Sequence, residues 1–198
     1  MKRIFFINGN KIDVTLEDEK TVGDVLKSFE ATCVENEMET IGVELDGESI
    51  SADAFDSILN RPLTENTRIN MSVISIQEIT AAFKVAGTRL TALADKLEHI
   101  SVQFQSGNGL DVQNTIRELA DGIDFFCHTA TLSALFPQKY GTLVIGETPL
   151  KDFFAEFSPI LADFKQAMES HDTVTVGDLA EYELSPRLES ITKTIREL

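Results

Sequence analysis

Residues 68–79 read Arg-Ile-Asn-Met-Ser-Val-Ile-Ser-Ile-Gln-Glu-Ile, and within them the chain changes from strand-like to helix-like periodicity. The first part of the stretch alternates between polar and apolar residues, and its apolar positions are Ile69, Met71 and Val73. This alternation predicts a β-strand with one buried face. From Ile76 onward, apolar residues recur at steps of three and four, as they do along an amphipathic helix. We therefore predict an α+β protein with two domains, residues 1–75 and 76–198.

Downstream of this stretch the apolar pattern is helical. Its first segment is a regular seam of about four heptads, formed by Ile76, Ile79, Phe83, Ala86, Leu90, Leu93, Leu97, Ile100 and Phe104. Three more amphipathic segments follow, at 112–130, 150–167 and about 173–198. The simplest assembly is an antiparallel four-helix bundle, and pairing of the seam with a second chain as a coiled coil is the alternative. Two interior prolines, in Ser158-Pro159 and Ser185-Pro186, predict that the last two helices either bend or split in two.

Upstream of the stretch, the pattern predicts a hairpin, a helix, a strand, a short helical segment and the last strand. The hairpin turns at Asn8-Gly9-Asn10, a sequence typical of tight turns. The segment after the turn alternates, with apolar residues at Ile12, Val14 and Leu16. Thr21, with Asp24 three residues later, predicts a capped helix start. The next strand has apolar residues at Ile41, Val43 and Leu45 and runs into the turn sequence Asp46-Gly47.

This order of elements resembles the ubiquitin-like β-grasp fold over residues 1–75. The resemblance is carried by the hairpin, the helix opened by Thr21, the Asp46-Gly47 turn and the approach to the last strand at residues 63–69, Leu-Thr-Glu-Asn-Thr-Arg-Ile. It implies a fold rather than an activity, and it implies that a face of the sheet binds partners. Ubiquitin-like modifiers end in a free Gly-Gly tail. Here the last strand continues into a helix, so conjugation through that terminus is not expected.

The charge of the chain excludes some classes of partner. Lys and Arg number 17 and Asp and Glu number 33, which gives a formal net charge of −16. Residues 1–75 carry 7 basic and 15 acidic residues and residues 76–198 carry 10 and 18, so each domain has a net charge of −8. Binding to nucleic acid or to an anionic membrane surface requires clustered Lys and Arg, so neither is expected.

Targeting signals and cysteines indicate where the protein works. We find no run of about 18 apolar residues that would cross a membrane. The apolar run near the start, at residues 4–7, is shorter than the roughly 7 residues that a signal peptide needs. Cys33 and Cys127 lie far apart without a Cys-x-x-Cys motif. We therefore expect reduced thiols and a cytoplasmic location.

Catalytic, cofactor and metal sites are not predicted. The candidate metal ligands are Cys33, His99, Cys127, His128 and His171, and no pair of them has the spacing of a zinc motif. Adjacent helical residues point about 100° apart, so Cys127 and His128 do not form a nucleophile–base pair. The glycine-rich stretches lack the spacing and the Lys of phosphate-binding loops. The carboxylate clusters fit a solvated acidic surface.

Two features predict an interaction surface instead. The first strand is apolar on both faces, at Ile4, Phe5, Phe6 and Ile7. One face packs on the helix, and the other face must be covered by the helical domain, a second copy of the chain or a partner. Tyr182 lies one turn before Pro186, which lacks the N–H that would bond the Tyr182 carbonyl. Residues 178–186 around it, Asp-Leu-Ala-Glu-Tyr-Glu-Leu-Ser-Pro, are similar to a segment of uncharacterised bacterial helical domains.

The sequence therefore predicts a cytoplasmic, non-enzymatic bacterial protein that acts as an adaptor for a basic or amphipathic protein partner, and a homodimer stays open. One alternative is an acidic chaperone of the secretion or flagellar-export type, whose helices hold an amphipathic helix of a client. The other alternative is an enzyme with its site in a cleft between the two domains. Such an enzyme would require carboxylates in the cleft that perturb one another's pKa values.

Overall fold

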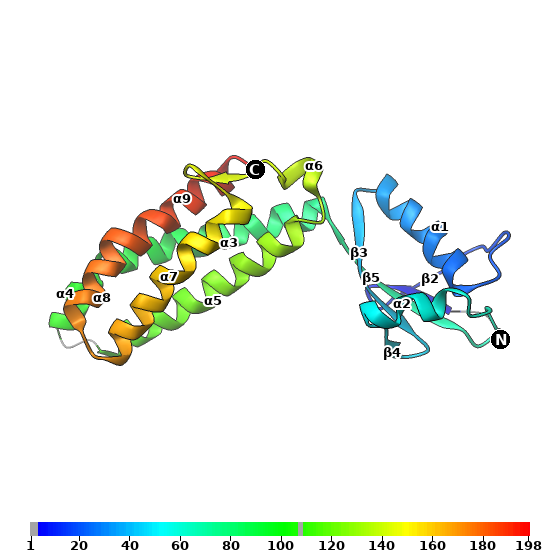
Figure 1. Cartoon of the computed structure of the whole chain (residues 1–198), viewed down its shortest axis with the longest axis horizontal. Helices are drawn as coiled ribbons and strands as arrows, with labels where there is room; N and C mark the ends of the chain where they lie inside the picture. Colours follow the sequence, from blue (N-terminus) through cyan, green and yellow to red (C-terminus); the bar gives the residue numbers. More distant parts are fainter. Residues whose placement is uncertain (1–3, 107–108) are drawn as a thin grey trace. The chain divides into compact units, whose positions relative to one another are not determined.

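The computed structural model describes residues 4–106 and 109–198 and shows an α+β protein (Figure 1). The chain divides into two compact units, Met1–Glu78 and Ile79–Leu198. The division falls within the stretch where the periodicity of the sequence changes. Among the helices that the structure describes, none is long and apolar enough to span a membrane.

A five-stranded mixed sheet forms the centre of the first unit. Its strands are β1 (Ile4–Ile7), β2 (Asn10–Ile12), β3 (Met38–Leu45), β4 (Glu48–Ser49) and β5 (Arg68–Ser75). They lie in the order β2-β1-β5-β3-β4. Strands β1 and β5 are parallel, and the other neighbouring pairs are antiparallel. The alternating stretch that ends the unit is therefore its central strand.

Both hairpins of the sheet turn on residues with positive φ. Asn8 and Gly9 have φ of 49° and 76°, and Asp46 and Gly47 have φ of 55° and 92°. Two consecutive positive φ angles are typical of type I′ turns, which match the twist of the flanking strands. The predicted strand after the first turn is longer than the observed one. The observed strand, β2, ends at Ile12, opposite Phe5, and Val14 is 42% exposed.

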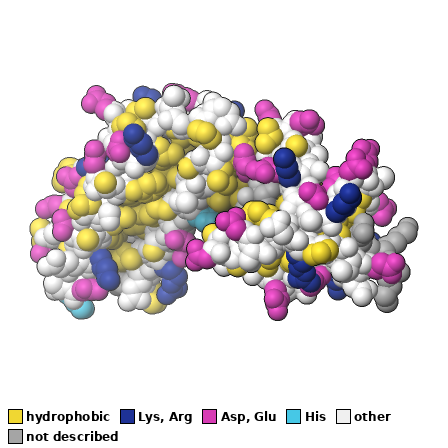
Figure 2. All heavy atoms as spheres, turned by 45° about the vertical axis from the view of Figure 1, so that its right-hand side comes forward, with side chains coloured by type: hydrophobic (Ala, Val, Ile, Leu, Met, Phe, Trp, Pro, Cys, Tyr) yellow, Lys and Arg dark blue, Asp and Glu magenta, His cyan; other side chains and the backbone are white. Residues whose placement is uncertain are grey.

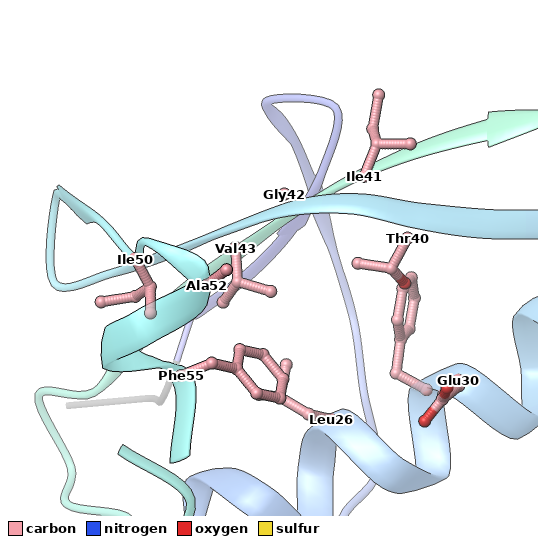
Figure 3. A pocket seen from close by; sticks show the side chains of 10 residues that line it. Leu26, Glu30, Thr40, Ile41, Gly42, Val43, Ile50, Ala52 and Phe55 are labelled. Atoms are coloured by element: carbon pink, nitrogen blue, oxygen red, sulfur yellow. The ribbon is translucent and has the colours of Figure 1, made fainter. Parts of the chain in front are cut away.

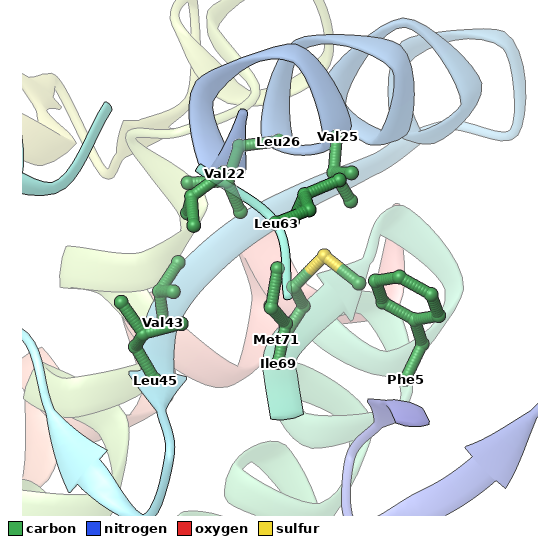
Figure 4. Close-up of a cluster of buried hydrophobic side chains, with 9 residues drawn as sticks. All are labelled: Phe5, Val22, Val25, Leu26, Val43, Leu45, Leu63, Ile69 and Met71. Atoms are coloured by element: carbon green, nitrogen blue, oxygen red, sulfur yellow. The ribbon is translucent and has the colours of Figure 1, made fainter. Parts of the chain in front are cut away.

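One helix covers one face of this sheet (Figure 4). Helix α1 (Val22–Glu35) begins with the capping box that the sequence predicts, because Thr21 Oγ1 accepts from the Asp24 N–H and the Asp24 carboxylate accepts from the Thr21 N–H. The shared core contains Phe5, Val22, Val25, Leu26, Val43, Leu45, Leu63, Ile69 and Met71. A shorter helix, α2 (Ala52–Leu59), lies beside α1.

A β-bulge corrects the prediction for the third strand. Val43 and Leu45 are buried as expected, but Ile41 is 47% exposed. The register between β3 and β5 shifts between Thr40 and Gly42. A bulge inserts one extra residue, so the two-residue alternation is interrupted there and Ile41 leaves the buried face.

The second unit is helical apart from one small hairpin. Its elements are α3 (Ile76–Glu98), whose first turn belongs to the first unit, α4 (Ile100–Gln105), α5 (Gly109–Ser133), α6 (Pro137–Tyr140), β6 (Val144–Ile145), β7 (Thr148–Pro149), α7 (Leu150–Glu169), α8 (Thr173–Asp178), the π-helix η1 (Leu179–Leu184) and α9 (Ser185–Arg196). Strands β6 and β7 pair antiparallel.

The heptad seam of α3 lies inside this unit. Ile79, Phe83, Ala86, Leu90 and Leu97 are fully buried within the chain. The ring centroid of Phe83 lies 6.1 Å from that of Phe126 on α5 and 5.6 Å from that of Tyr140. The seam is therefore occupied by the chain's own helices. Pairing of the seam with a second chain as a coiled coil would require these helices to separate.

The two interior prolines have different effects. Pro159 lies inside α7, which continues through it as one helix. Pro186 follows η1, in which the Ser185 N–H donates to the carbonyl of Ala180, five residues earlier. A π-helical turn contains one more residue than an α-helical turn. The wider π-helical turn before Pro186 thus accommodates a residue that has no N–H to donate.

Candidate functional site

The four apolar residues of β1 divide between the two faces of the sheet. Phe5 is 3% exposed and belongs to the core beneath α1, so it is not available to a partner. Successive side chains of a strand point to opposite faces, which places Ile4 and Phe6 on the face away from α1. Ile4, Phe6 and Ile7 are half-buried. The predicted surface is therefore reduced to Ile4 and Phe6 on this outer face.

The outer face around Phe6 is more polar than the first strand alone suggests. The guanidinium of Arg68 lies over the Phe6 ring, 5.6 Å from its centroid. Beside it, Asn70 Nδ2 donates to Glu44 Oε2 at 2.9 Å. A shallow hollow of about 270 Å³ is lined by Phe6, Gly9, Glu44, Gly47, Arg68 and Asn70. On this face Phe6 therefore contacts side chains of its own chain, and the polar groups of Asn70 and Glu44 bond each other.

Tyr182 is at the surface of the second unit. It lies in η1, and its side chain is 65% exposed. The Glu181 carboxylate beside it raises the pKa of its hydroxyl. One turn later, Arg187 Nη1 donates to the Glu183 carbonyl at 2.9 Å and to the Glu183 carboxylate at 2.6 Å. Tyr182 is thus an exposed aromatic side chain on a π-helical turn with an acidic surrounding.

An apolar groove that sequence analysis did not identify lies between α1, β3 and α2 (Figure 3). Its volume is about 350 Å³, and it is lined by Leu26, Phe29, Glu30, Thr40, Ile41, Gly42, Val43, Ile50, Ala52 and Phe55. In Figure 3, Thr40 and Val43 point from β3 toward α1, whereas Ile41 points away from it. The Phe55 ring extends from α2 toward Leu26.

The strand that forms one wall of the groove has an open edge. On one side, β3 pairs with β5 from Met38 to Leu45. On the other side, β4 pairs only with Glu44 and Leu45, and the Ile50 N–H donates to the Val43 carbonyl at 2.9 Å. Among the residues that the structure describes, no strand pairs with residues 38–42 on this side. An edge of this kind is a template for a further strand.

The elements that form the groove are acidic. The three elements that form it carry seven carboxylates, which are Asp24, Glu30, Glu35, Glu39, Glu44, Asp53 and Asp56. They carry one cation, Lys27. Glu30 is exposed and lines the groove itself. The surface around the apolar floor therefore favours positive charge.

Close packing between α1 and α2 fixes the shape of the groove. A Cβ atom on Gly23 would lie 2.7 Å from the carbonyl oxygen of Leu59, so only glycine permits this approach. A second hollow shares Leu26, Glu30 and Phe55 with the groove and extends it along α1 to Gly23 and Asn60. One feature of the sequence could have indicated this site, namely how closely the short helix follows β4. Only Ile50 and Ser51 separate the two-residue β4 from the short helix, so β4 does not extend along β3.

The second unit has an apolar hollow of its own. It measures about 390 Å³ and is lined mainly by residues of α5, α6, α7 and the segments that follow α5 and α6, namely Ala130, Ala134, Pro137, Tyr140, Leu143, Leu150 and Phe154. At its wall the hydroxyls of Tyr140 and Thr80 lie 2.7 Å apart, and burial raises the pKa of Tyr140. Hydrophobic side chains also reach the surface elsewhere on this unit (Figure 2).

The thiols are in surroundings that disfavour reactivity. Burial raises the pKa of Cys33 and of Cys127, and the neighbouring Asp124 carboxylate raises the pKa of Cys127 further. A thiol with a raised pKa stays protonated near neutral pH, whereas a nucleophile needs the thiolate. In residues 4–106 and 109–198, no three His, Cys, Asp or Glu side chains are close enough to hold a metal ion together.

Known proteins match both units. Residues 4–75 match the family described as the TP0873 N-terminal domain, and residues 86–194 match a domain of unknown function, DUF8042. An uncharacterised protein of Treponema pallidum (strain Nichols) is 31% identical over 189 residues, which cover 96% of this chain and 94% of that protein. The versican core protein of Homo sapiens is 25% identical over 166 residues, which cover 73% of this chain but 5% of that protein. No solved structure matches the chain.

The matches follow the division of the chain into two units. The predicted similarity to uncharacterised bacterial proteins is confirmed by the alignment with the Treponema protein. Neither matched family is described by an activity. Because both families match in order and the Treponema protein aligns over nearly its whole length, the chain belongs to the family of that uncharacterised protein, with a TP0873 N-terminal domain followed by a DUF8042 domain.

Proposed function

We propose that the protein is a non-enzymatic adaptor that binds another protein through its first unit. The observation that carries this proposal is the apolar groove beside the open edge of β3. The groove combines a space that an apolar side chain can fill with a strand edge that can bond a backbone. Partner binding by strand addition uses both of these features.

We further assign the first unit to the β-grasp type and the second unit to the antiparallel four-helix bundles. The strand order β2-β1-β5-β3-β4, the parallel pair β1–β5 and the helix across one face support the first assignment. The four longer helical stretches, with α3 buried along its seam, support the second. A β-grasp unit whose last strand continues into a helix serves as a binding module rather than as a conjugated tag.

A binding role also agrees with the chemistry of the groove and with the charge of the chain. The groove is lined by apolar side chains, one hydroxyl and one exposed carboxylate. The net charge of −16 is spread over both units, as the scattered acidic side chains in Figure 2 illustrate. A cytoplasmic adaptor of this composition stays soluble and binds selectively to a partner that is apolar and basic.

The test compares two variants of the full chain in affinity purification from cells that produce the protein, with quantitative mass spectrometry. Phe55→Ser removes an apolar side chain of the groove that is 36% exposed, and Val14→Ser removes one that is 42% exposed at the opposite edge of the sheet. We expect at least one protein to be retained by the wild type and by Val14→Ser and lost with Phe55→Ser. The same set of proteins on all three baits would contradict the proposal, and retention that depends on the helical unit instead would favour the chaperone alternative.

A further inference from the structure

The open edge of β3 and the adjoining groove restrict what can bind there. Residues 38–42 leave room for about five residues of an added strand, which is a usual strand length. Side chains of such a strand point alternately to the two faces of the sheet. Every second side chain of the added strand would therefore point to the α1 side, where the groove lies.

The groove specifies the side chains on that face. Its floor contains Leu26 and Val43, and its end is formed by Phe55. A space of about 350 Å³ accommodates one large apolar side chain or two smaller ones. The carbonyl of Val43 is already bonded by the Ile50 N–H, so the added strand would end before this residue.

The charges specify the remaining side chains. Seven carboxylates and one cation lie on the three elements around the groove, which gives these elements a net charge of −6. Glu30 faces the groove from α1, and Glu39 lies on β3 itself, where no ion pair involving it is found among the described residues. Side chains alternate along β3, and Thr40 points toward α1, so Glu39 points to the opposite face of the sheet. A Lys or Arg between the apolar residues of a bound segment would point to the same face as Glu39 and be attracted to it. A second copy of this chain would bring the same acidic elements to the site and be repelled.

We propose that the groove binds an extended segment of a partner protein in which apolar residues alternate with Lys or Arg, and that this segment adds as a strand to the free edge of β3. This inference rests on the proposed function and names its partner class. Backbone bonds to β3 supply affinity, and the groove and its carboxylates select the sequence.

The experiment selects random peptides of about twelve residues, displayed on phage, against the full chain. We expect enrichment of peptides with apolar residues at alternate positions and Lys or Arg between them. Fluorescence anisotropy with the synthetic form of an enriched peptide then compares four variants. Glu39→Lys and Phe55→Ser are expected to weaken binding by about tenfold or more. Asp13→Lys and Val14→Ser make the same changes in charge and polarity at the opposite edge of the sheet and are expected to stay within about twofold.

Two further measurements make the result specific. Raising the salt concentration is expected to weaken binding, because exposed charges are screened. Amide signals of residues 38–42 are expected to shift in NMR spectra when the peptide is added. Circular dichroism melting confirms that each variant is folded, and none of the four substituted side chains is buried.

Three outcomes would overturn the inference: no enriched peptides, enriched peptides without the alternating basic pattern, or binding that is insensitive to Glu39→Lys. If a purified partner still requires Phe55 while one of these outcomes occurs, the adaptor function stands and the partner class is wrong. If no protein requires Phe55 and no peptide is enriched, both proposals fail. Concentration-dependent self-association that is lost in Phe55→Ser would identify a second copy as the occupant and would also overturn the inference.

Discussion

At the scale of single residues, the start of α1 shows how strongly one local pattern can determine structure. Thr21 and Asp24 exchange bonds in a capping box, and the Asp24 carboxylate also accepts from the Lys20 N–H at 3.0 Å. Backbone hydrogen bonds from Lys20 and Thr21 lower the pKa of Asp24 from its ordinary value of 3.8. The charged carboxylate is thus favoured in the folded state.

The first prediction concerns Asp24→Asn. Because the folded-state pKa lies below 3.8, the ionised group contributes stability above this pH, and the contribution is lost as pH falls through the folded pKa. We expect Asp24→Asn to unfold at lower urea concentration than the wild type at pH 7. The difference is expected to shrink below pH 3.8. Urea titrations followed by circular dichroism at several pH values measure it, and an equal difference at all pH values would contradict the assignment.

At the scale of elements, the groove depends on how closely α2 approaches α1. Gly23 is the point of contact, since a Cβ atom there would meet the Leu59 carbonyl at 2.7 Å. The contact involves backbone atoms, so no side-chain rotation can relieve it. The position of α2, and with it that of Phe55, therefore rests on one glycine.

The second prediction is that Gly23→Ala destabilises the protein by about 1–3 kcal/mol, as overpacking does, and weakens partner binding at the groove. Alanine has a higher helix propensity than glycine, so a loss of stability would arise from the contact with Leu59. Gly109→Ala is the matched control, because no heavy atom lies within 4 Å of a Cβ placed at Gly109. Thermal unfolding measures both variants. A Gly23→Ala variant as stable as Gly109→Ala would show that α2 does not need this approach.

The element scale is also where the sequence patterns fail. Ile41 has the right spacing for a buried residue, but the bulge at Thr40/Gly42 turns it outward. Val14 also has the right spacing, but β2 ends two residues before it. In both cases the side-chain period is correct only while the strand keeps its register, and the register is set by the neighbouring strand.

At the scale of the whole molecule, each unit has its own buried side chains. Ile69 is fully buried in the sheet unit, and Phe83 is fully buried in the helical unit among aromatic neighbours. The division between the units follows the change of period in the sequence. Each unit is thus organised around a separate core.

The third prediction is that a cavity in one core loosens mainly the unit that contains it. Phe83→Ala is expected to cost about 3–5 kcal/mol and Ile69→Ala about 2–5 kcal/mol. Hydrogen exchange followed by mass spectrometry should show faster exchange in residues 79–198 for Phe83→Ala and in residues 4–78 for Ile69→Ala. Equal acceleration in both units from either variant would mean that the two cores unfold together.

The sequence by itself determined the α+β class, the change of period near residue 76, the capped helix, the glycine turns and the buried seam. These features depend on residues that are close in the chain, so local periodicity and turn chemistry are sufficient to predict them. Only the tertiary structure decided that Phe5 belongs to the core, that Ile41 leaves it, and that α1, β3 and α2 enclose a groove beside an open strand edge. These features depend on strand register and on how closely the backbones of segments far apart in the sequence approach each other. No local pattern encodes either of them.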